Sequence, residues 1–301
     1  MDSMLPTLRQ LQYLKLLAEH GSFSRAAEAA HVTQPTLSAG IQELEKVLGA
    51  PVVDRARSGV ILTQMGEEAV RRGGQILAQA EDMVQAARSA GQPLSGRFRL
   101  GVIPTVAPFL LPKALPVLRE KFPKLRLFLR EDLTQRLIAG LKAGALDAAL
   151  IALPYNTAGL EVARVADDEL LAALPANHRL VGSGPLALER MEGEDLILLE
   201  DGHCLRDHAL SACGLEPPRG AADGGFAATS LPTLVQMVGS GLGVSFLPAM
   251  AVEAGLAELA PVSIRHLGAD HHPSREIVVC WRAGSSRGPE GRLLAETLQN
   301  L

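Results

Sequence analysis

The sequence predicts an α/β protein preceded by a mainly helical amino-terminal domain. Three observations support this fold class. Apolar residues recur at spacings of three and four near the amino terminus, one long helical pattern follows from Gln64, and short apolar stretches alternate with helical ones from Phe98 onward. A chain of 301 residues, 47% of them apolar, has room for two or three domains with buried cores.

Composition limits where the protein can act. There is no apolar run of the length that spans a membrane, and residues 1–10 have neither the basic start nor the apolar stretch of a signal peptide. We therefore expect a cytoplasmic protein that does not bind membranes. The net charge of −4 argues against a protein that coats nucleic acid, but it allows a small DNA-reading domain because such contacts are local.

The amino-terminal helices have the pattern of a helix-turn-helix. Four leucines at helical spacing predict a first helix that ends near His20-Gly21. Ser22 is placed to cap a short second helix, and Thr33 to cap a third. The third helix carries one apolar stripe, formed by Leu37, Ile41, Leu44 and Leu48. Two short helices joined by a tight turn are the arrangement that places a recognition helix in DNA.

Polar residues near the start of the third helix are candidates for reading bases. Hydroxyls and amides can reach base edges, and glutamine pairs bidentately with adenine. The candidates are Thr33, Gln34, Thr36, Ser38 and Gln42. The segment 51–63 looks like a hairpin, or wing, in which Arg55 and Arg57 would contact phosphates. The alternative is a small helical bundle, and six basic against six acidic residues up to Leu62 indicate that specificity would come from a dimer.

The helical pattern from Gln64 to Ala90 resembles the seam of a coiled coil. Its small and apolar residues alternate at spacings of four and three: Ala69, Gly73, Ile76, Ala80, Met83 and Ala87. Gly73-Gly74 costs about 2 kcal/mol of helix propensity, so we expect a kink or a very close crossing there. The alternative is a helix buried within its own chain.

A change of composition at Gly91–Gly96 indicates a hinge, and an α/β pattern follows it. The expected strands are 98–103, 125–129, 148–153, 170–174, 196–199, 244–247 and 276–281, and the expected helices are 106–121, 135–143, 231–239 and 289–300. Alternation of this kind predicts a mostly parallel sheet in two units.

Cys204 is the strongest candidate for chemistry. It lies between His203 and Arg206 and just after Gly202, where a helix is expected to begin. A cationic neighbour and a helix N-terminus both lower the pKa of a thiol from about 8.5 into the range of roughly 3.5 to 7.5. We therefore expect Cys204 to be a reactive sulfur with a lowered pKa.

A second cysteine, Cys213, follows nine positions later. If one helix joined the two cysteines, their Cα atoms would lie about 13 Å apart, whereas a disulfide needs about 7 Å or less. The pair could be joined only after the segment is remodelled, as a redox switch requires. The alternative is two unrelated thiols in a reducing compartment. Cys280 lies in an apolar strand and is expected to be inert.

The amino-terminal motifs resemble the winged helix-turn-helix of LysR-type transcriptional regulators. They are Phe23-Ser24-Arg25-Ala26-Ala27, residues 32–38, residues 41–45 and Leu62-Thr63-Gln64-Met65-Gly66. The resemblance adds Ser24, Arg25 and Pro35 to the expected DNA-contacting residues, and departs at Ala39-Gly40 and Glu43.

The resemblance covers essentially the whole chain and implies its domain organisation. Residues 1–63 would form the DNA-binding domain and 64–95 a dimerising linker helix and hinge. Residues 96–301 would form a two-lobed effector domain like periplasmic binding proteins. Lobe I would hold about 96–164 and 271–301, and lobe II about 165–270.

Residues 199–213 resemble the sensing segment of the peroxide-responsive branch of this family, with matches at His203, Cys204, Leu205, Arg206, Asp207 and Cys213. The resemblance implies that Cys204 attacks hydrogen peroxide and is captured by Cys213 as a disulfide. The loop 214–225 would refold. Residues that would line the peroxide site are Thr105, Thr134, His203, Arg206, Asp207 and Arg275. Taken alone, each of the two threonines would be interpreted as a helix cap, and Asp207 would orient Arg206 or His203.

These matches imply an activator of peroxide-defence genes that works as a dimer or tetramer on promoter DNA. RNA polymerase and a reductant of the glutaredoxin or thioredoxin type would be its partners. Two rival hypotheses are a regulator that binds a small metabolite between the lobes and a thiol peroxidase.

No cofactor or metal ion is expected. Gly239, Gly241 and Gly243 follow a helix and precede a strand, the reverse of the order in dinucleotide-binding motifs. His266, His271 and His272 fall in a polar segment without a second cluster of ligands, which indicates a solvated loop.

Overall fold

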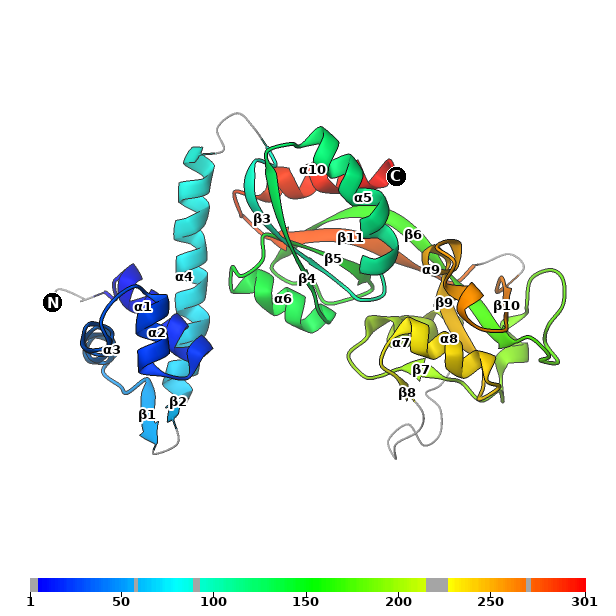
Figure 1. The fold of residues 1–301 in the computed structure, drawn as a ribbon, viewed down its shortest axis with the longest axis horizontal. Coiled ribbons are helices and arrows are strands. Elements are labelled where there is room, and N and C mark those ends of the chain that lie inside the picture. Colours follow the sequence, from blue (N-terminus) through cyan, green and yellow to red (C-terminus); the bar gives the residue numbers. More distant parts are fainter. Residues whose placement is uncertain (1–4, 57–58, 89–92, 215–226, 269–271) are drawn as a thin grey trace. The chain divides into compact units, whose positions relative to one another are not determined.

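The computed structural model describes residues 5–56, 59–88, 93–214, 227–268 and 272–301. The chain forms two compact units: the first comprises residues 1–90 and 142–145, and the second comprises residues 91–141 and 146–301. Figure 1 shows the elements of each unit.

The amino-terminal unit contains the expected helix-turn-helix and wing. Its helices are α1 (Leu8–His20), α2 (Phe23–Ala29), α3 (Gln34–Leu48) and α4 (Gln64–Arg88), and β1 (Val53–Ala56) pairs antiparallel with β2 (Gly59–Leu62). None of the helices in the described ranges is long and apolar enough to cross a membrane.

Local sequence explains where these helices start. Thr7 and Gln10 form a reciprocal capping box at α1, and the Thr33 hydroxyl accepts from the Thr36 amide at α3, 3.4 Å away. The expectation for Ser22 is wrong in part: it occupies the N-cap position of α2, but its side chain makes no capping hydrogen bond there. The predicted apolar stripe of α3 packs into the core of this unit through Leu37, Ile41 and Leu44.

The first half of α4 packs on α1. A Cβ added at Gly73 would lie 3.2 Å from the Leu11 side chain, so the close crossing expected at this glycine is with a helix of the same chain. Farther along α4, Ile76 and Met83 are exposed by 43% and 70%. Of the residues predicted to form a coiled-coil seam, Gly73 therefore packs against α1, whereas Ile76 and Met83 are exposed.

Gly66 is the position in this unit where a side chain fits least. A Cβ there would lie 2.0 Å from the Val52 carbonyl oxygen, which accepts from the Thr63 amide. In a helix, glycine to alanine ordinarily stabilises by about 1 kcal/mol. We expect Gly66→Ala to destabilise the unit instead, by about 1–3 kcal/mol, because the backbone must move. Urea unfolding followed by circular dichroism measures this difference, and a gain in stability would contradict the packing described.

Lobe I of the second unit is built on a mixed sheet. Strand β3 (Gly96–Val102) lies between β4 (Leu125–Glu131) and β5 (Ala148–Leu153) and is parallel to both. Strand β11 (Ser274–Arg282) lies between β5 and the first half of β6 (Leu160–Pro175) and is antiparallel to both. Helices α5 (Ala107–Lys121) and α10 (Gly288–Gln299) lie on one side of these strands and α6 (Thr134–Lys142) on the other (Figure 1).

Lobe II is built around the second half of β6. That half pairs with β9 (Ser245–Pro248) and β10 (Val262–Arg265), and the short strands β7 (Leu198–Leu199) and β8 (Ala227–Ala228) pair beside them. Its helices are α7 (Cys204–Cys213), α8 (Leu231–Gly239) and α9 (Ala249–Glu253), with short 3₁₀ turns at Leu188–Met191 and Leu256–Leu259.

Strand β6 is much longer than the predicted strand at 170–174. It runs through both lobes because residues 160–169 pair with β11 and residues 170–175 pair with β9 and β10. The prediction was based on a continuous apolar run, which only the second half of β6 has. The first half mixes exposed and buried residues, so it was not predicted as a strand. Each lobe has its own buried core, and β6 and β11 connect them.

Candidate functional site

Cys204 is the first residue of α7 and lies at the junction of the two lobes. Gly202 turns the chain just before the helix with a φ of +96°, a conformation that favours glycine. The Cys204 side chain is 6% exposed and belongs to the core of lobe I, whereas the next residue, Leu205, belongs to the core of lobe II. The thiol therefore holds the start of α7 against the other lobe.

The expectation of a lowered thiol pKa is wrong for this conformation. Burial raises the pKa of Cys204, while the Thr134 hydroxyl and the Arg275 guanidinium oppose that rise. Of the two neighbours assumed to be cationic, His203 has a pKa that burial lowers, and the charge of the Arg206 guanidinium is balanced by the Asp201 carboxylate at 3.0 Å. The raised pKa of Cys204 favours its thiol form in this conformation.

Thr134 places a hydroxyl beside this sulfur. Its side chain is 1% exposed, in the first turn of α6. The hydroxyl is near enough to lower the thiol pKa, yet the two groups do not meet the geometry of a full hydrogen bond, and Thr134 Oγ1 has no other partner among the described residues. A buried hydroxyl without a partner is costly, so this one is available to a bound ligand.

Arg275 and Asp168 form a buried ion pair at the junction of the two lobes. Arg275 faces Asp168 across β11 and β6, and its Nε and Nη2 donate to Asp168 Oδ2 at 2.9 and 2.8 Å. Its Nη1 donates to the Thr105 hydroxyl at 2.7 Å, and Nη2 to the Thr105 carbonyl at 3.0 Å. Asp168 also accepts from the Met250 amide at 3.0 Å. The guanidinium is thereby fixed with its charge close to Cys204.

Neither threonine caps a helix. Helix α5 has Val106 as its N-cap residue, and the Thr105 hydroxyl instead accepts from Arg275. A hydroxyl that accepts one bond still has its own hydrogen to donate. The capping interpretation therefore gives way to a contact with Arg275 for Thr105 and to an unpaired position beside the sulfur for Thr134.

No hydrogen bond or ion pair joins the side chains of the other predicted site residues to this group in the part of the chain that the structure describes. His203 is half-buried and directly precedes Cys204 in the chain. Arg206 pairs with Asp201, so the expectation that Asp207 orients Arg206 is wrong. Asp207 is exposed, and its charge raises the pKa values of Cys204 and Tyr155, although burial is the main cause for both.

Two residues of the site were not predicted. Asp168 is needed because a fully buried arginine must have a counter-charge, but the run Asp167-Asp168-Glu169 does not show which acid faces inward. His208 is one helical turn after Cys204, on the same face of α7, and is 4% exposed. The four-residue spacing between Cys204 and His208 could have indicated that both lie on the same face of a helix.

His208 contacts the other lobe through one nitrogen. Nε2 lies 2.9 Å from the Pro154 carbonyl oxygen, which can only accept, so Nε2 carries the hydrogen. Nδ1 is buried and has no partner among the described residues. Burial lowers the pKa of His208, and Arg275 adds to this effect, whereas the Pro154 carbonyl and Asp207 oppose it.

The lowered pKa of His208 predicts a loss of stability in acid. Because the folded state disfavours the imidazolium, the contribution is fully present above the unfolded pKa of 6.5 and is lost as the pH falls below it. The loss from this group is at most about 1.4 kcal/mol per pH unit. His208→Gln keeps a donor for Pro154 but cannot titrate, so its free energy of unfolding should fall less between about pH 7.5 and 5.5. Parallel curves for the two proteins would contradict this assignment.

Cys213 ends the same helix that Cys204 begins. The helix α7 is continuous over its ten residues, which places the two Cα atoms about 13 Å apart along the axis, too far for a disulfide. Most of the loop 214–225 lies outside the described residues.

The DNA-contact candidates surround the start of α3. Ser24, Arg25, Thr33, Gln34, Pro35, Thr36 and Gln42 are exposed, and Ser38 is half-buried. The Ser24 hydroxyl donates to Gln34 Oε1 at 3.2 Å, so α2 orients the glutamine. Gly40, where the motif departs from the family, leaves space for Tyr13, since a Cβ there would lie 2.7 Å from the ring. The Arg55 side chain and Arg57 lie outside the described residues.

The arrangement gathers hydrogen-bond donors and one positive charge around a thiol. One sulfur, two hydroxyls able to donate and a fixed guanidinium come together at the lobe junction in an enclosed region. Such donors stabilise negative charge that develops on a leaving oxygen. Cys280, by contrast, is fully buried in β11, and burial raises its pKa to about 12.

Two family models match the chain. Residues 8–67 match the bacterial regulatory helix-turn-helix protein of the lysR family, and residues 91–301 match the LysR substrate binding domain.

Curated relatives match nearly the whole chain. The HTH-type transcriptional regulator EstR of Acinetobacter baylyi is 38% identical over 99% of this chain and 97% of its own length. The DNA-binding transcriptional dual regulator OxyR of Escherichia coli is 37% identical over 97% of this chain and 94% of its own.

Two similar solved structures are those of OxyR proteins. A cysteine-to-aspartate variant of full-length OxyR from Pseudomonas aeruginosa is 34% identical and superposes with a TM-score of 0.79, covering 98% of each chain. A cysteine-to-serine variant of OxyR from Corynebacterium glutamicum with hydrogen peroxide bound is 32% identical, with a TM-score of 0.67 over 99% of this chain and 93% of the other.

Proposed function

The chain belongs to the LysR family of bacterial helix-turn-helix transcription regulators, and on this premise we propose that it senses hydrogen peroxide through Cys204. The main support is the buried Thr134 hydroxyl beside the buried Cys204 thiol, because among the described residues this hydroxyl has no partner that meets full hydrogen-bond geometry. A hydroxyl in that position can donate to a small oxygen-containing reactant. Relatives named hydrogen peroxide-inducible genes activator add independent support.

The chemistry begins with attack of the Cys204 sulfur on one peroxide oxygen. The O–O bond breaks, the sulfur becomes a sulfenic acid, and the other oxygen leaves as water after it takes up the thiol proton. Thr105 and Thr134 donate hydrogen bonds to the peroxide oxygens, and Arg275 stabilises the negative charge of the leaving oxygen. His203, Arg206 and Asp207, which flank Cys204 in the chain, would border the site, with Arg206 held by Asp201.

The sulfenic acid then reacts with Cys213. The Cys213 thiol forms the S–S bond, and the sulfenic oxygen leaves as a second water. Because α7 holds the cysteines about 13 Å apart, this step requires the helix to unwind. Unwinding removes Cys204 from the core of lobe I and His208 from Pro154, so oxidation changes how the lobes are joined.

Regulation follows from the amino-terminal unit. We propose that α3 reads promoter DNA through Thr33, Gln34, Thr36, Ser38 and Gln42. Ser24, Arg25 and Pro35 would contact the DNA at the same surface. Arg55 and Arg57 of the wing would contact DNA phosphates. The exposed apolar residues Ile76 and Met83 of α4 would bury against a second copy, giving dimers and tetramers. The oxidised form would activate peroxide-defence genes through RNA polymerase, in the cytoplasm, and a glutaredoxin or thioredoxin would reset it.

A second candidate is a regulator that responds to a small metabolite between the lobes. EstR, an HTH-type transcriptional regulator, is as similar to this chain as the OxyR relatives are, so overall similarity does not by itself select a peroxide sensor. In a metabolite-responsive regulator the cysteines would be incidental.

Thr134→Val tests the peroxide proposal directly. The change removes the hydroxyl and keeps the volume, so the reaction of Cys204 with hydrogen peroxide should slow by about 10- to 1000-fold, as expected for a lost oxyanion donor. The measurement is the loss of free Cys204 thiol over time in the reduced full-length protein. Thr297→Val is the matched control, since Thr297 is also buried but donates to the Leu293 carbonyl in α10.

Equal rates for Thr134→Val and the control would remove the support for peroxide binding and would favour the metabolite-responsive alternative. We also propose that the protein is not a peroxidase. With peroxide and a thiol reductant in excess, consumption should therefore stop near one equivalent per chain on the time scale of the first oxidation.

A further inference from the structure

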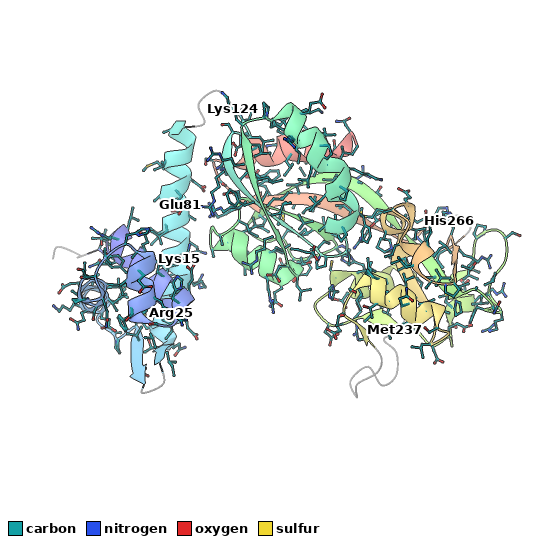
Figure 2. All side chains as sticks on the ribbon, in the orientation of Figure 1. Lys15, Arg25, Glu81, Lys124, Met237 and His266 are labelled. Carbon is teal, nitrogen blue, oxygen red and sulfur yellow. The ribbon has the colours of Figure 1, made fainter. Side chains whose placement is uncertain are left out.

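Two histidines and a glutamate from three separate segments meet where β6 crosses between the lobes. Glu169 is the last residue of β6 that pairs with β11, His266 follows the end of β10, and His272 precedes the start of β11. Figure 2 labels His266 at the surface of the second unit, near the strands of lobe II. The sequence indicated a solvated loop without a second ligand cluster, and Glu169 is the group that this interpretation lacked.

The three side chains have the spacing of ligands around one ion. Both His266 Nδ1 and His272 Nδ1 approach the same oxygen, Glu169 Oε1, at 2.8 and 3.1 Å. One candidate ligand atom from each of the three residues lies within 4.8 Å of the other two. Ligands bound to zinc at about 2.0–2.2 Å lie about 3.3 Å from each other in a tetrahedral site. The two distances from the histidine nitrogens to Glu169 Oε1, 2.8 and 3.1 Å, are already close to that separation.

We propose that Glu169, His266 and His272 form a binding site for a divalent transition-metal ion, with Zn²⁺ as the best chemical match. Two imidazoles and one carboxylate are a known set of three protein ligands for zinc, in which water takes the fourth position. Imidazole suits Zn²⁺, Ni²⁺ and Cu²⁺, whereas Mg²⁺ and Ca²⁺ prefer oxygen ligands alone.

The exposure of the groups fits entry of an ion from solvent. His266 and His272 side chains are 62% and 49% exposed, and that of Glu169 is 25% exposed. The carboxylate is fixed by its strand, and the two imidazoles are fixed by their contact with it and by their edge-to-face contact, with ring centroids 6.2 Å apart. A bound ion would tie β6 to the segments that end β10 and begin β11, so it would stabilise the connection between the lobes.

Titration of the reduced full-length protein with Zn²⁺ tests the site. Isothermal titration calorimetry should show one binding event in the wild type that weakens by at least about tenfold in His266→Ala, His272→Ala and Glu169→Gln. The thermal midpoint should rise with Zn²⁺ in the wild type and rise less in these variants. His20→Ala is the matched control, because His20 is an exposed histidine at the end of α1.

Co²⁺ separates this site from the cysteines. Thiolate ligands give a strong near-ultraviolet charge-transfer band, whereas a site of two histidines and a glutamate gives only weak visible bands. We expect the weak bands in the wild type and in His20→Ala, and their loss in His266→Ala. Zn²⁺ binding that is the same in all variants, a Co²⁺ spectrum with only the thiolate band, or no binding at all would overturn the proposal. None of these measurements depends on reaction with peroxide.

Discussion

Cys204→Ser will lose the reaction with hydrogen peroxide. The serine hydroxyl is a far weaker nucleophile than sulfur, and Thr105, Thr134 and Arg275 would remain without a group to activate. We expect the fast oxidation phase to disappear, a loss of at least about a thousandfold, as for other removed nucleophiles. The measurement is the rate of peroxide consumption in a single turnover, together with the transcriptional response of cells that carry the variant.

Cys280→Ser is the control for this variant. Cys280 is fully buried in the lobe I core, and burial raises its pKa to about 12, so its removal should leave the peroxide reaction unchanged. A Cys204→Ser protein that still switches transcription in response to peroxide would contradict the proposed function. A response that follows a metabolite and ignores peroxide in both proteins would favour the second candidate.

Asp168→Ala will destabilise the effector domain by about 3–5 kcal/mol, because it leaves the fully buried Arg275 guanidinium without its counter-charge. The variant also removes the acceptor for the Met250 amide. Urea unfolding of the full-length protein, followed by fluorescence of the single tryptophan, Trp281, measures the effect. Trp281 is suited to this because it is fully buried in β11, the strand that carries Arg275.

The double variant Asp168→Ala with Arg275→Met is the matched control. Removing both charges avoids the unpaired ion, so much of the stability should return, whereas the peroxide reaction should stay slow because the guanidinium is gone. A single-variant loss below about 1 kcal/mol would show that the pair is less isolated from solvent than its contacts indicate.

Much of the fold could be predicted from local patterns. Helical spacing placed α1, α3 and α4, and turn residues such as Gly21 marked where they end. Strand β6 was predicted only in its second half because its first half alternates in exposure and depends on β11, which is about 110 positions farther along the chain. Pairing over such a distance cannot be inferred from neighbouring residues.

The sequence predicted the position of Cys204 but not the direction in which its pKa is shifted. The sequence placed Cys204 at a helix N-terminus, as the structure has it, but the expected lowering of its pKa assumed access to solvent. Burial against lobe I reverses the direction of the shift. Asp168 and Glu169 were missed for a related reason: in a strand, adjacent side chains point to opposite faces, and only the partner strands decide which face holds the arginine and which the histidines.

We propose that peroxide joins Cys204 and Cys213, which lie at opposite ends of one helix, in a disulfide. The most direct test is mass spectrometry of the reduced protein after about one equivalent of hydrogen peroxide, a stoichiometry set by the formation of one disulfide. We predict a rapid and nearly complete peptide link between Cys204 and Cys213, with Cys280 unmodified. An unmodified Cys204 without any link would contradict the peroxide-sensing account.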